Sequence, residues 1–363
     1  MRIAFYGSSL LSAYWNGAAT YYRGMLSELA KRGWEIVFFE PDAFDRQQHR
    51  DIDPPSWAEV VVWKNEAHAC DAVIRRAHEA DVVVKASGVG VFDEDLLRVF
   101  DHARADALRV YWDVDAPATL ADLDKAPDHP LRRRLSEIDM VLTYGGGAPV
   151  TEAFRALGAS ACHPIYNALD PATHHPVASE ARYEAHLALL ANRLPDREAR
   201  IEAFFLEPAR QLPLKRFLLG GNGWADKSVP PNVRAVGHVG TMDHNAFNCS
   251  CLAVLNVSRD SMAEVGFSPA TRVFEAAGAG SCLITDEWRG VEQFLKPNEE
   301  VLVARDGQDV AEHLQRLTPD RARAIGAAAR RRVLDDHTYA QRAQLADALF
   351  RDALAVRRER SAA

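Results

Sequence analysis

The segment 262–286, MAEVGFSPATRVFEAAGAGSCLITD, holds the residue types that most clearly suggest chemistry. Ser268 followed by Pro269 predicts the start of a helix, because serine caps free N–H groups and proline fits the first helical position. Gly280 predicts the end of that helix, of about eleven residues, before a β-branched strand. The free N–H groups and the positive end of the helix dipole would together form an anion site, with phosphate as the usual occupant.

Arg272 and Glu275 lie three residues apart in the predicted helix and so share nearly one face. A guanidinium there could hold a diphosphate through two parallel hydrogen bonds, and a carboxylate could accept hydrogen bonds from ribose or sugar hydroxyls. The alternative is an ion pair within the helix, which contributes about 0.3–0.5 kcal/mol. The neighbouring Gly266 and Ser268 favour a binding site.

Two carboxylates in the first half of the chain also suggest chemistry. Asp113 and Asp115 end a predicted strand in YWDVDAP (111–117), and their spacing puts both on one face of an extended segment. One of them could be a general base for a substrate hydroxyl. The pair could instead hold a divalent cation, or form a turn and cap the helix that follows.

The histidines and cysteines predict no metal centre and no disulfides. His163, His174 and His175 lie near the middle of the chain without cysteine or carboxylate at a metal-binding spacing, so we expect unliganded loop histidines. The five cysteines include no C-x-x-C pair. A reducing compartment, the cytoplasm, is therefore expected.

Composition narrows the class of protein further. The 363 residues carry a formal net charge of −8, which predicts no sequence-independent binding to nucleic acid. No apolar run approaches the ~18 residues of a transmembrane helix, and the N-terminus resembles a strand more than a signal peptide. At this length about two domains are expected.

Strands and helices alternate along the chain, which predicts an α/β fold with parallel sheets. A proline-rich segment, PIYNALDPATHHP (164–176), predicts the junction between two domains. We expect an N-terminal Rossmann-like domain over 1–168, a C-terminal one over 169–338, and a helix over 339–363 that packs back towards the first domain. From about residue 319 onward the chain is expected to be wholly helical. The expected strands are 2–7, 34–40, 59–64, 81–87, 107–114 and 139–144 in the first domain, and 186–191, 216–221, 233–239, 252–258, 281–286 and 300–304 in the second.

The chain resembles GT-B glycosyltransferases, in the branch of the spore maturation protein CgeB. The resemblance rests on ordered stretches that cover most of the chain, which are 5–36, 111–120, 139–147, 164–176, 190–209, 233–262 and 266–286. It implies two facing Rossmann-like domains with a C-terminal helical tail. It also implies a nucleotide-sugar donor on the second domain and an acceptor on the first.

The resemblance assigns roles to individual residues. It implies that Arg272 contacts the diphosphate and Glu275 the ribose or sugar hydroxyls, and both are expected to act in catalysis. Asp113 and Asp115 are candidate catalytic residues from their own pattern, and a base or acceptor-hydroxyl ligand and a helix cap stay open as their roles; a metal between the two aspartates is disfavoured in a two-domain architecture. The expected donor-binding residues are Gly7, Gly17, Asn192, Arg193, Arg197, Gly237, His238, Val239, Gly266, Ser268, Arg272 and Glu275. The expected acceptor-binding residues are Trp15, Trp112, Tyr144 and Gly145.

Two alternatives stay open in this assignment. Arg193 and Arg197 either bind diphosphate or form salt bridges to Asp196 or Glu198. Related retaining enzymes often carry a glutamate eight positions before the one matching Glu275, and Phe267 stands there in this chain. Both retention and inversion of the anomeric configuration therefore remain open.

The implied activity is metal-independent transfer of a hexose or deoxyhexose from a nucleoside-diphosphate sugar to an acceptor hydroxyl. The donor is expected to be a UDP- or TDP-sugar, the acceptor a small molecule or a glycan, and no cofactor is expected to be tightly bound. The alternatives are a non-catalytic sugar-nucleotide-binding protein of the same fold and a nucleotide-sugar epimerase.

Overall fold

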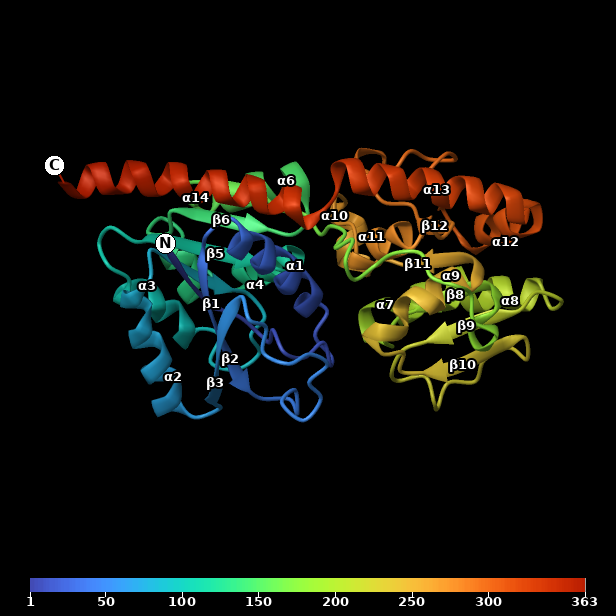
Figure 1. The fold of residues 1–363 in the computed structure, drawn as a ribbon, viewed down its shortest axis with the longest axis horizontal. Helices are drawn as coiled ribbons and strands as arrows, with labels where there is room; N and C mark the ends of the chain where they lie inside the picture. The colour runs from blue at the N-terminus through green and yellow to red at the C-terminus, as the bar shows by residue number, and fades with distance from the viewer. Residues whose placement is uncertain (363) are drawn as a thin grey trace. The chain divides into compact units, whose positions relative to one another are not determined.

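The computed structural model describes residues 1–362, which form two compact units (Figure 1). Unit 1 consists of residues 1–167 together with the last helix, which begins at Tyr339. Unit 2 consists of residues 168–338. Each unit is a parallel sheet covered by helices, so the predicted α/β class with two Rossmann-like domains is confirmed.

Unit 1 contains a seven-stranded sheet in the order β3-β2-β1-β4-β5-β6-β7. All its strand pairs are parallel; Ile3, for example, pairs with Ile36 on one side and with Val82 on the other. The order reverses beside β1, and ligands of such sheets bind at the carboxyl ends of the strands. The strands are β1 (Arg2–Tyr6), β2 (Glu35–Asp42), β3 (Ala58–Lys64), β4 (Val82–Ala86), β5 (Leu108–Asp113), β6 (Met140–Thr143) and β7 (Cys162–Pro164).

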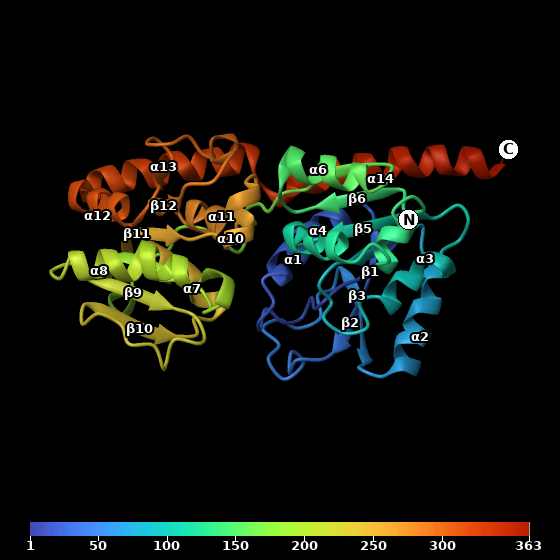
Figure 2. The ribbon, with the colours of Figure 1, turned by 180° about the vertical axis from the view of Figure 1, so that it is seen from behind.

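The last helix completes unit 1 by packing on its first helix (Figures 1 and 2). Gly24 permits this close approach, because a Cβ there would lie 2.2 Å from the Tyr339 ring. The Trp34 indole also donates a hydrogen bond to Asp347 at 2.7 Å. The helices of unit 1 are α1 (Ala18–Lys31), α2 (Ala67–Arg75), α3 (Val99–His102), α4 (Ala116–Lys125), α5 (Pro130–Arg134), α6 (Gly147–Ala156) and α14 (Tyr339–Ala362).

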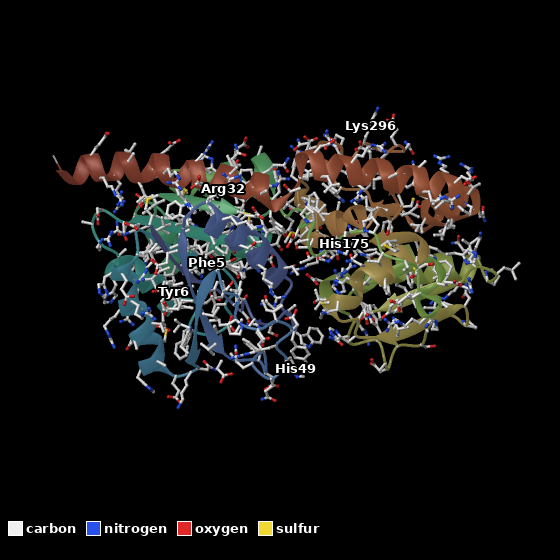
Figure 3. All side chains as sticks on the ribbon, in the orientation of Figure 1. Phe5, Tyr6, Arg32, His49, His175 and Lys296 are labelled. Carbon is white, nitrogen blue, oxygen red and sulfur yellow. The ribbon has the colours of Figure 1, made fainter. Side chains whose placement is uncertain are left out.

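Aromatic side chains dominate the core of unit 1. Phe5 and Tyr6, on the central strand, lie inside the unit in Figure 3. Phe5 stacks on Phe38 with ring centroids 5.2 Å apart, and Tyr6 stacks on Phe39 at 4.5 Å. Because the central strands are covered on both faces, they read as continuous apolar runs rather than as alternating ones.

Unit 2 contains a six-stranded parallel sheet in the order β10-β9-β8-β11-β12-β13. Its core is built from apolar side chains of the central strands, such as Leu187, Leu189 and Leu255, together with the helices that cover them. The strands are β8 (Ala185–Leu190), β9 (Phe217–Gly220), β10 (Val233–Gly237), β11 (Cys251–Asn256), β12 (Leu283–Asp286) and β13 (Leu302–Ala304).

The helices of unit 2 follow the strands in the expected alternation, and one of them contains a π-helical turn over Glu202–Leu206. The helices are α7 (Pro195–Ile201), α8 (Glu207–Gln211), α9 (His244–Cys249), α10 (Asp260–Val265), α11 (Thr271–Gly278), α12 (Gly307–Arg316) and α13 (Pro319–Asp336). Within residues 1–362, no helix is both long and apolar enough to cross a bilayer.

The tail described from residue 319 onward is helical as expected, apart from one break at residues 337–338. Helix α13 ends at Asp336, and α14 starts at Tyr339. His337 leaves the helix because its ring packs between Phe274 and Phe294, with centroids 5.8 and 5.5 Å away, while its carbonyl accepts a hydrogen bond from the Leu169 N–H. These tertiary contacts override the helical preference of the local sequence.

Candidate functional site

The loop before α11 differs from the predicted helix start. Helix α11 begins at Thr271, with Ala270 as a cap residue that makes no side-chain hydrogen bond. Ser268 does not cap the helix, because its hydroxyl donates to the Gly266 carbonyl at 2.9 Å. Gly266 has a φ of +76°, and a Cβ there would lie 2.7 Å from Arg289. The backbone of this loop thus lies directly against Arg289, and the Phe267 N–H donates a hydrogen bond to the Arg289 carbonyl at 2.6 Å. A turn therefore replaces the predicted first helical turn.

Arg272 and Glu275 project from the first turns of α11 and are largely buried. Their side chains are 15% and 7% exposed, and Arg272 Nη2 lies 3.9 Å from Glu275 Oε2. This distance is too long for a hydrogen bond, so the pair is not the tight surface ion pair of the alternative. Arg272 Nη1 is buried and has no hydrogen-bond partner within residues 1–362. Burial lowers the pKa of Arg272, while the charge of Glu275 opposes that shift.

Arg197, on α7, adds a second cation to this region. Its Nη2 donates to the Asn192 carbonyl at 2.9 Å, and its Nε is buried without a partner among the described residues. Burial and, to a smaller extent, the positive charge of Arg272 lower the pKa of Arg197 to about 10. The two guanidinium groups are therefore close enough to repel each other, and an anion placed there would relieve that repulsion.

Arg193 behaves differently, although it lies only four residues earlier. It makes a two-pronged contact with Glu198, with Nε and Nη2 donating at 2.8 and 2.9 Å, and its Nη1 donates to Asp226 at 3.0 Å. Two carboxylates thus neutralise Arg193. Arg193 thus has the salt bridge to Glu198 that the alternative expects, which argues against a role as donor ligand, whereas Arg197 keeps that role as a proposal.

Residues 237–239 follow the edge strand β10. Gly237 has a φ of +70° and, like His238, is exposed, whereas Val239 is buried in a small cluster with Phe247. Asn192 comes two residues after the carboxyl end of β8, a central strand of the same sheet. Its Oδ1 accepts a hydrogen bond from the backbone N–H of Asn222 at 2.9 Å. These residues all lie at or after the carboxyl ends of unit 2 strands, where the nucleotide is expected.

Asp113 lies at the carboxyl end of β5 in unit 1 and is 0% exposed. Its Oδ1 accepts hydrogen bonds from the Ser87 hydroxyl at 2.8 Å, the Asp115 N–H at 2.9 Å and the Thr119 hydroxyl at 3.1 Å. Its Oδ2 has no hydrogen-bond partner within the described chain. Burial raises the pKa of Asp113 to about 6. Asp113 therefore stabilises the start of α4, and a role as general base remains a proposal.

The predicted acceptor residues fall into two groups. Trp15 is 45% exposed, and Tyr144 is half-buried beside the buried Gly145 at the carboxyl end of β6. Trp112, in contrast, is 1% exposed, and its indole donates to the Tyr21 hydroxyl at 2.9 Å. Trp112 is therefore part of the core and not, as predicted, a residue at a binding surface.

Glu40 organises the loop that follows β1, a role that the sequence did not reveal. This fully buried carboxylate accepts hydrogen bonds from the Ser9 hydroxyl at 3.0 Å and the Leu10 N–H at 2.5 Å. Gly7 leads into this loop, and a Cβ there would lie 2.6 Å from the Phe38 ring, so packing accounts for this glycine. Gly17 precedes α1 and has open space around it.

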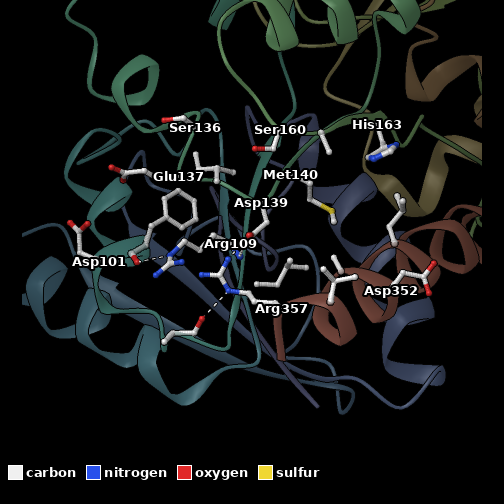
Figure 4. A pocket seen from close by; sticks show the side chains of 18 residues that line it. Asp101, Arg109, Ser136, Glu137, Asp139, Met140, Ser160, His163, Asp352 and Arg357 are labelled. Atoms are coloured by element: carbon white, nitrogen blue, oxygen red, sulfur yellow. Dashed lines mark hydrogen bonds and ion pairs between the residues drawn. The ribbon is translucent and has the colours of Figure 1, made fainter. Parts of the chain in front are cut away.

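A cavity of about 930 Å³ lies elsewhere in unit 1 (Figure 4). Arg109 and Met140, at the starts of β5 and β6, line it together with Arg357 from α14. Arg357 forms an ion pair with Asp139 and also donates to the Ala105 carbonyl at 3.0 Å. This cavity is at the amino ends of the strands, and it contains none of the predicted site residues.

Comparison with known proteins supports the architecture described above. Residues 197–348 match the family model described as glycosyl transferase-like. Sucrose-phosphate synthase from Thermosynechococcus elongatus is similar over 98% of this chain and 100% of that chain, with a TM-score of 0.71 and 15% identity. The chain has the GT-B fold. No curated protein matches it in sequence.

Other structures with this fold contain nucleotide sugars. HepE of Anabaena, in complex with UDP and glucose, has a TM-score of 0.70 and 16% identity over 96% of this chain and 99% of that one. An α-glucosyltransferase in complex with UDP-glucose and DNA has a TM-score of 0.71 and 11% identity, over 96% of this chain and 99% of that one. Because a protein with this fold binds DNA, the fold gives no support to the predicted exclusion of nucleic acid.

Proposed function

We propose that the protein is a glycosyltransferase that moves a hexose or deoxyhexose from a nucleoside-diphosphate sugar to an acceptor hydroxyl. The observation that supports this most is the pair of guanidinium groups at the carboxyl edge of the unit 2 sheet. Arg197 and Arg272 each have a buried nitrogen without a hydrogen-bond partner in the described chain. Such groups are costly unless an anion binds them, and a diphosphate provides the charge and the acceptor oxygens.

The leaving diphosphate gains negative charge as the glycosidic bond breaks. In the proposed mechanism, Arg272, Arg197 and the N–H groups at the start of α11 stabilise that charge. Glu275 accepts hydrogen bonds from ribose or sugar hydroxyls; burial favours its neutral form, but neighbouring positive charge, that of Arg272 included, keeps its pKa below the usual value, so it is ionised at neutral pH. With these cations in place the transfer requires no metal ion.

The acceptor is proposed to bind residues of unit 1. Trp15 offers an exposed aromatic face for stacking on a sugar, and Tyr144 with Gly145 offers hydrogen bonds and backbone approach. Asp113 is the proposed base, because a pKa of about 6 lets it accept a proton near neutral pH through Oδ2. Asp115, which is half-buried beside it, is the alternative base.

A second candidate function is binding of a sugar nucleotide without catalysis. Phe267 favours it, because related retaining enzymes often carry a glutamate there. The Phe267 backbone has a φ of +48°, and its ring contacts the guanidinium of Arg289 at 5.1 Å. No carboxylate therefore occupies this position of the loop.

The test starts from thermal unfolding in the presence of UDP- and TDP-sugars. A donor at about 100 times its dissociation constant stabilises the protein by about 2.7 kcal/mol. The stabilising donor is then incubated with and without candidate acceptors, DNA included, and the products are separated. A new glycoside, or slow hydrolysis of the donor, supports the transferase. Binding with neither product supports the non-catalytic alternative, and NMR of the product anomer decides between retention and inversion.

A further inference from the structure

Three side chains of unit 2 converge beside Arg272, although the sequence predicted no such cluster. They are His174 from the loop after β7, His244 at the start of α9, and Glu275 on α11. One ligand atom from each lies within 4.8 Å of the other two. His174 Nε2 is 3.9 Å from Glu275 Oε1, and the centroids of the two imidazole rings are 6.0 Å apart.

Packing against α11 holds His174 in place. A Cβ at Gly278 would lie 2.3 Å from the Leu169 side chain and 3.0 Å from the His174 carbonyl, so this glycine lets the loop lie directly on the helix. Asn245 fixes the other side of the loop: its Nδ2 donates to the Thr173 carbonyl at 2.8 Å. Because Gly278 is one turn after Glu275, this packing brings His174 over the carboxylate.

The hydrogen bonds of Thr173 determine which nitrogen of His174 carries the proton. The Thr173 hydroxyl donates to the Asp170 carbonyl at 3.3 Å, so its oxygen accepts from His174 Nδ1 at 3.0 Å. In this tautomer the lone pair is on Nε2, the ring nitrogen that lies nearest Glu275. His174 is 5% exposed, and its Nε2 has no hydrogen-bond partner among residues 1–362. A lone pair and a carboxylate oxygen therefore face each other without a donor between them.

His244 supplies a second nitrogen of the same kind. Its Nδ1 is buried without a hydrogen-bond partner in the described chain, whereas the Val239 backbone hydrogen-bonds its ring. Two imidazoles and one carboxylate thus offer three possible ligand atoms, and a metal ion binds the imidazoles in their neutral form.

We propose that His174, His244 and Glu275 bind a divalent transition-metal ion, with Zn²⁺ as the class that this donor set suits best. Two imidazoles and one carboxylate form the ligand set of a zinc site that keeps a fourth position open. Bonds of about 2.0–2.1 Å put the ligand atoms about 3.3 Å apart, so the pair at 3.9 Å must close by about half an ångström, and a pair at the 4.8 Å limit of the cluster by about 1.5 Å. Arg272, next to Glu275 Oε2, stays in place to orient the carboxylate.

The consequence for activity rests on the proposed function. A metal ion on Glu275 occupies the carboxylate that the donor's hydroxyls would use. Zn²⁺ is therefore an inhibitor that competes with the nucleotide sugar, and transfer itself needs no metal. A metal ion bound to this cluster thus regulates the enzyme by preventing the nucleotide sugar from binding to Glu275.

The test uses the full chain and Co²⁺, whose visible d–d absorption is intense in a tetrahedral site. Titration with Co²⁺ should produce this band, and Zn²⁺ should displace it. His174→Gln and His244→Gln should each weaken binding by about 100-fold or more, since even the loss of a group that only supports a ligand costs 10–100-fold. The control is His175→Gln, because His175 is exposed and next in sequence (Figure 3); it should bind Co²⁺ as the wild type does.

The outcomes separate this inference from the proposed function. A tetrahedral band that is absent, or that survives in His174→Gln, overturns the metal site even if nucleotide sugars bind. A band that depends on His174 in a protein that binds no nucleotide sugar supports the metal site and removes the proposed function. If both ligands bind and Zn²⁺ leaves the affinity for UDP-glucose unchanged, the regulatory part of the proposal is wrong.

Discussion

The carboxyl edges of the two sheets differ in how their buried charged groups are arranged. In unit 2, the largely buried Arg197 and Arg272 lie close to each other, and each has a nitrogen with no partner in the described chain. In unit 1, backbone and hydroxyl donors hold the buried carboxylates Asp113 and Glu40, and Arg46 is one buried cation whose Nε likewise has no partner among the described residues. The proposed function therefore assigns the anion to the paired arginines of unit 2 and the hydroxyl-bearing acceptor to the carboxylates of unit 1.

This difference explains how one fold could serve both substrates of a transfer reaction. Burial of nitrogens that have no hydrogen-bond partner in the described chain makes these arginines of unit 2 costly in the free protein, and a diphosphate would remove that cost. Burial of Asp113 raises its pKa, which makes it a better proton acceptor near neutral pH than an exposed aspartate. The comparison can be tested at each edge separately.

The largest expected effect is at the unit 2 edge. Arg272→Ala removes a group that stabilises the leaving diphosphate, so the barrier to transfer should rise by about 2.7–4 kcal/mol, which is a 10²–10³-fold loss in kcat. Steady-state kinetics with the donor identified by thermal shift measure this loss, and circular dichroism checks the fold. Turnover close to that of the wild type would remove Arg272 from the mechanism.

The second effect concerns Asp113 at the unit 1 edge. Its folded-state pKa of about 6 is above the ordinary value, so its contribution to stability is present below about pH 4 and is lost as the pH rises to about 6. Asp113→Asn cannot ionise. Relative to the wild type, its free energy of unfolding should therefore be larger at pH 7.5 than at pH 4, by about 2 kcal/mol.

Urea unfolding of both proteins at the two pH values measures this difference. The measurement at pH 4 is the reference, because Asp113 is neutral in the folded protein there and the difference between the two proteins then reports mainly the change of side chain. A difference in stability that is the same at both pH values would show that Asp113 titrates normally.

The smallest effect tests the packing that builds the unit 2 edge. Gly278→Ala should gain up to about 1 kcal/mol in helix propensity but lose more through overlap with Leu169 and the His174 carbonyl, for a net loss of about 1 kcal/mol. Thermal unfolding measures it. Gly240→Ala is the control, since no atom lies within 4 Å of its Cβ position, and it should change stability by less than about 0.5 kcal/mol. Equal effects would contradict the role of Gly278.

Much of the fold could be predicted from the sequence because the central strands are continuous apolar runs. The runs around Val82–Ala86 and Cys251–Asn256 became strands almost as expected. The short edge strand Cys162–Pro164 was missed, because three residues carry no periodicity. The predicted cap at Ser268 failed because the loop is held by residues far away in sequence, around Arg289.

The candidate site could be predicted only in part. The pattern of residues 262–286 identified Arg272 and Glu275, which the structure places together. It could not separate Arg193 from Arg197, because both have carboxylates near them in sequence and only the fold pairs one of them. His244 belongs to no motif, and only the tertiary packing brings it to Glu275.

The most direct test of the anion site is calorimetric titration of UDP into two matched variants, Arg197→Gln and Arg193→Gln. Arg197 has a buried nitrogen with no partner in the described chain, whereas Arg193 is neutralised by Glu198 and Asp226. Loss of a charge-assisted hydrogen bond should weaken the affinity of Arg197→Gln for UDP by about 10-fold or more, while Arg193→Gln should stay within about twofold of the wild type. Equal losses in both variants, or a larger loss in Arg193→Gln, would contradict the account.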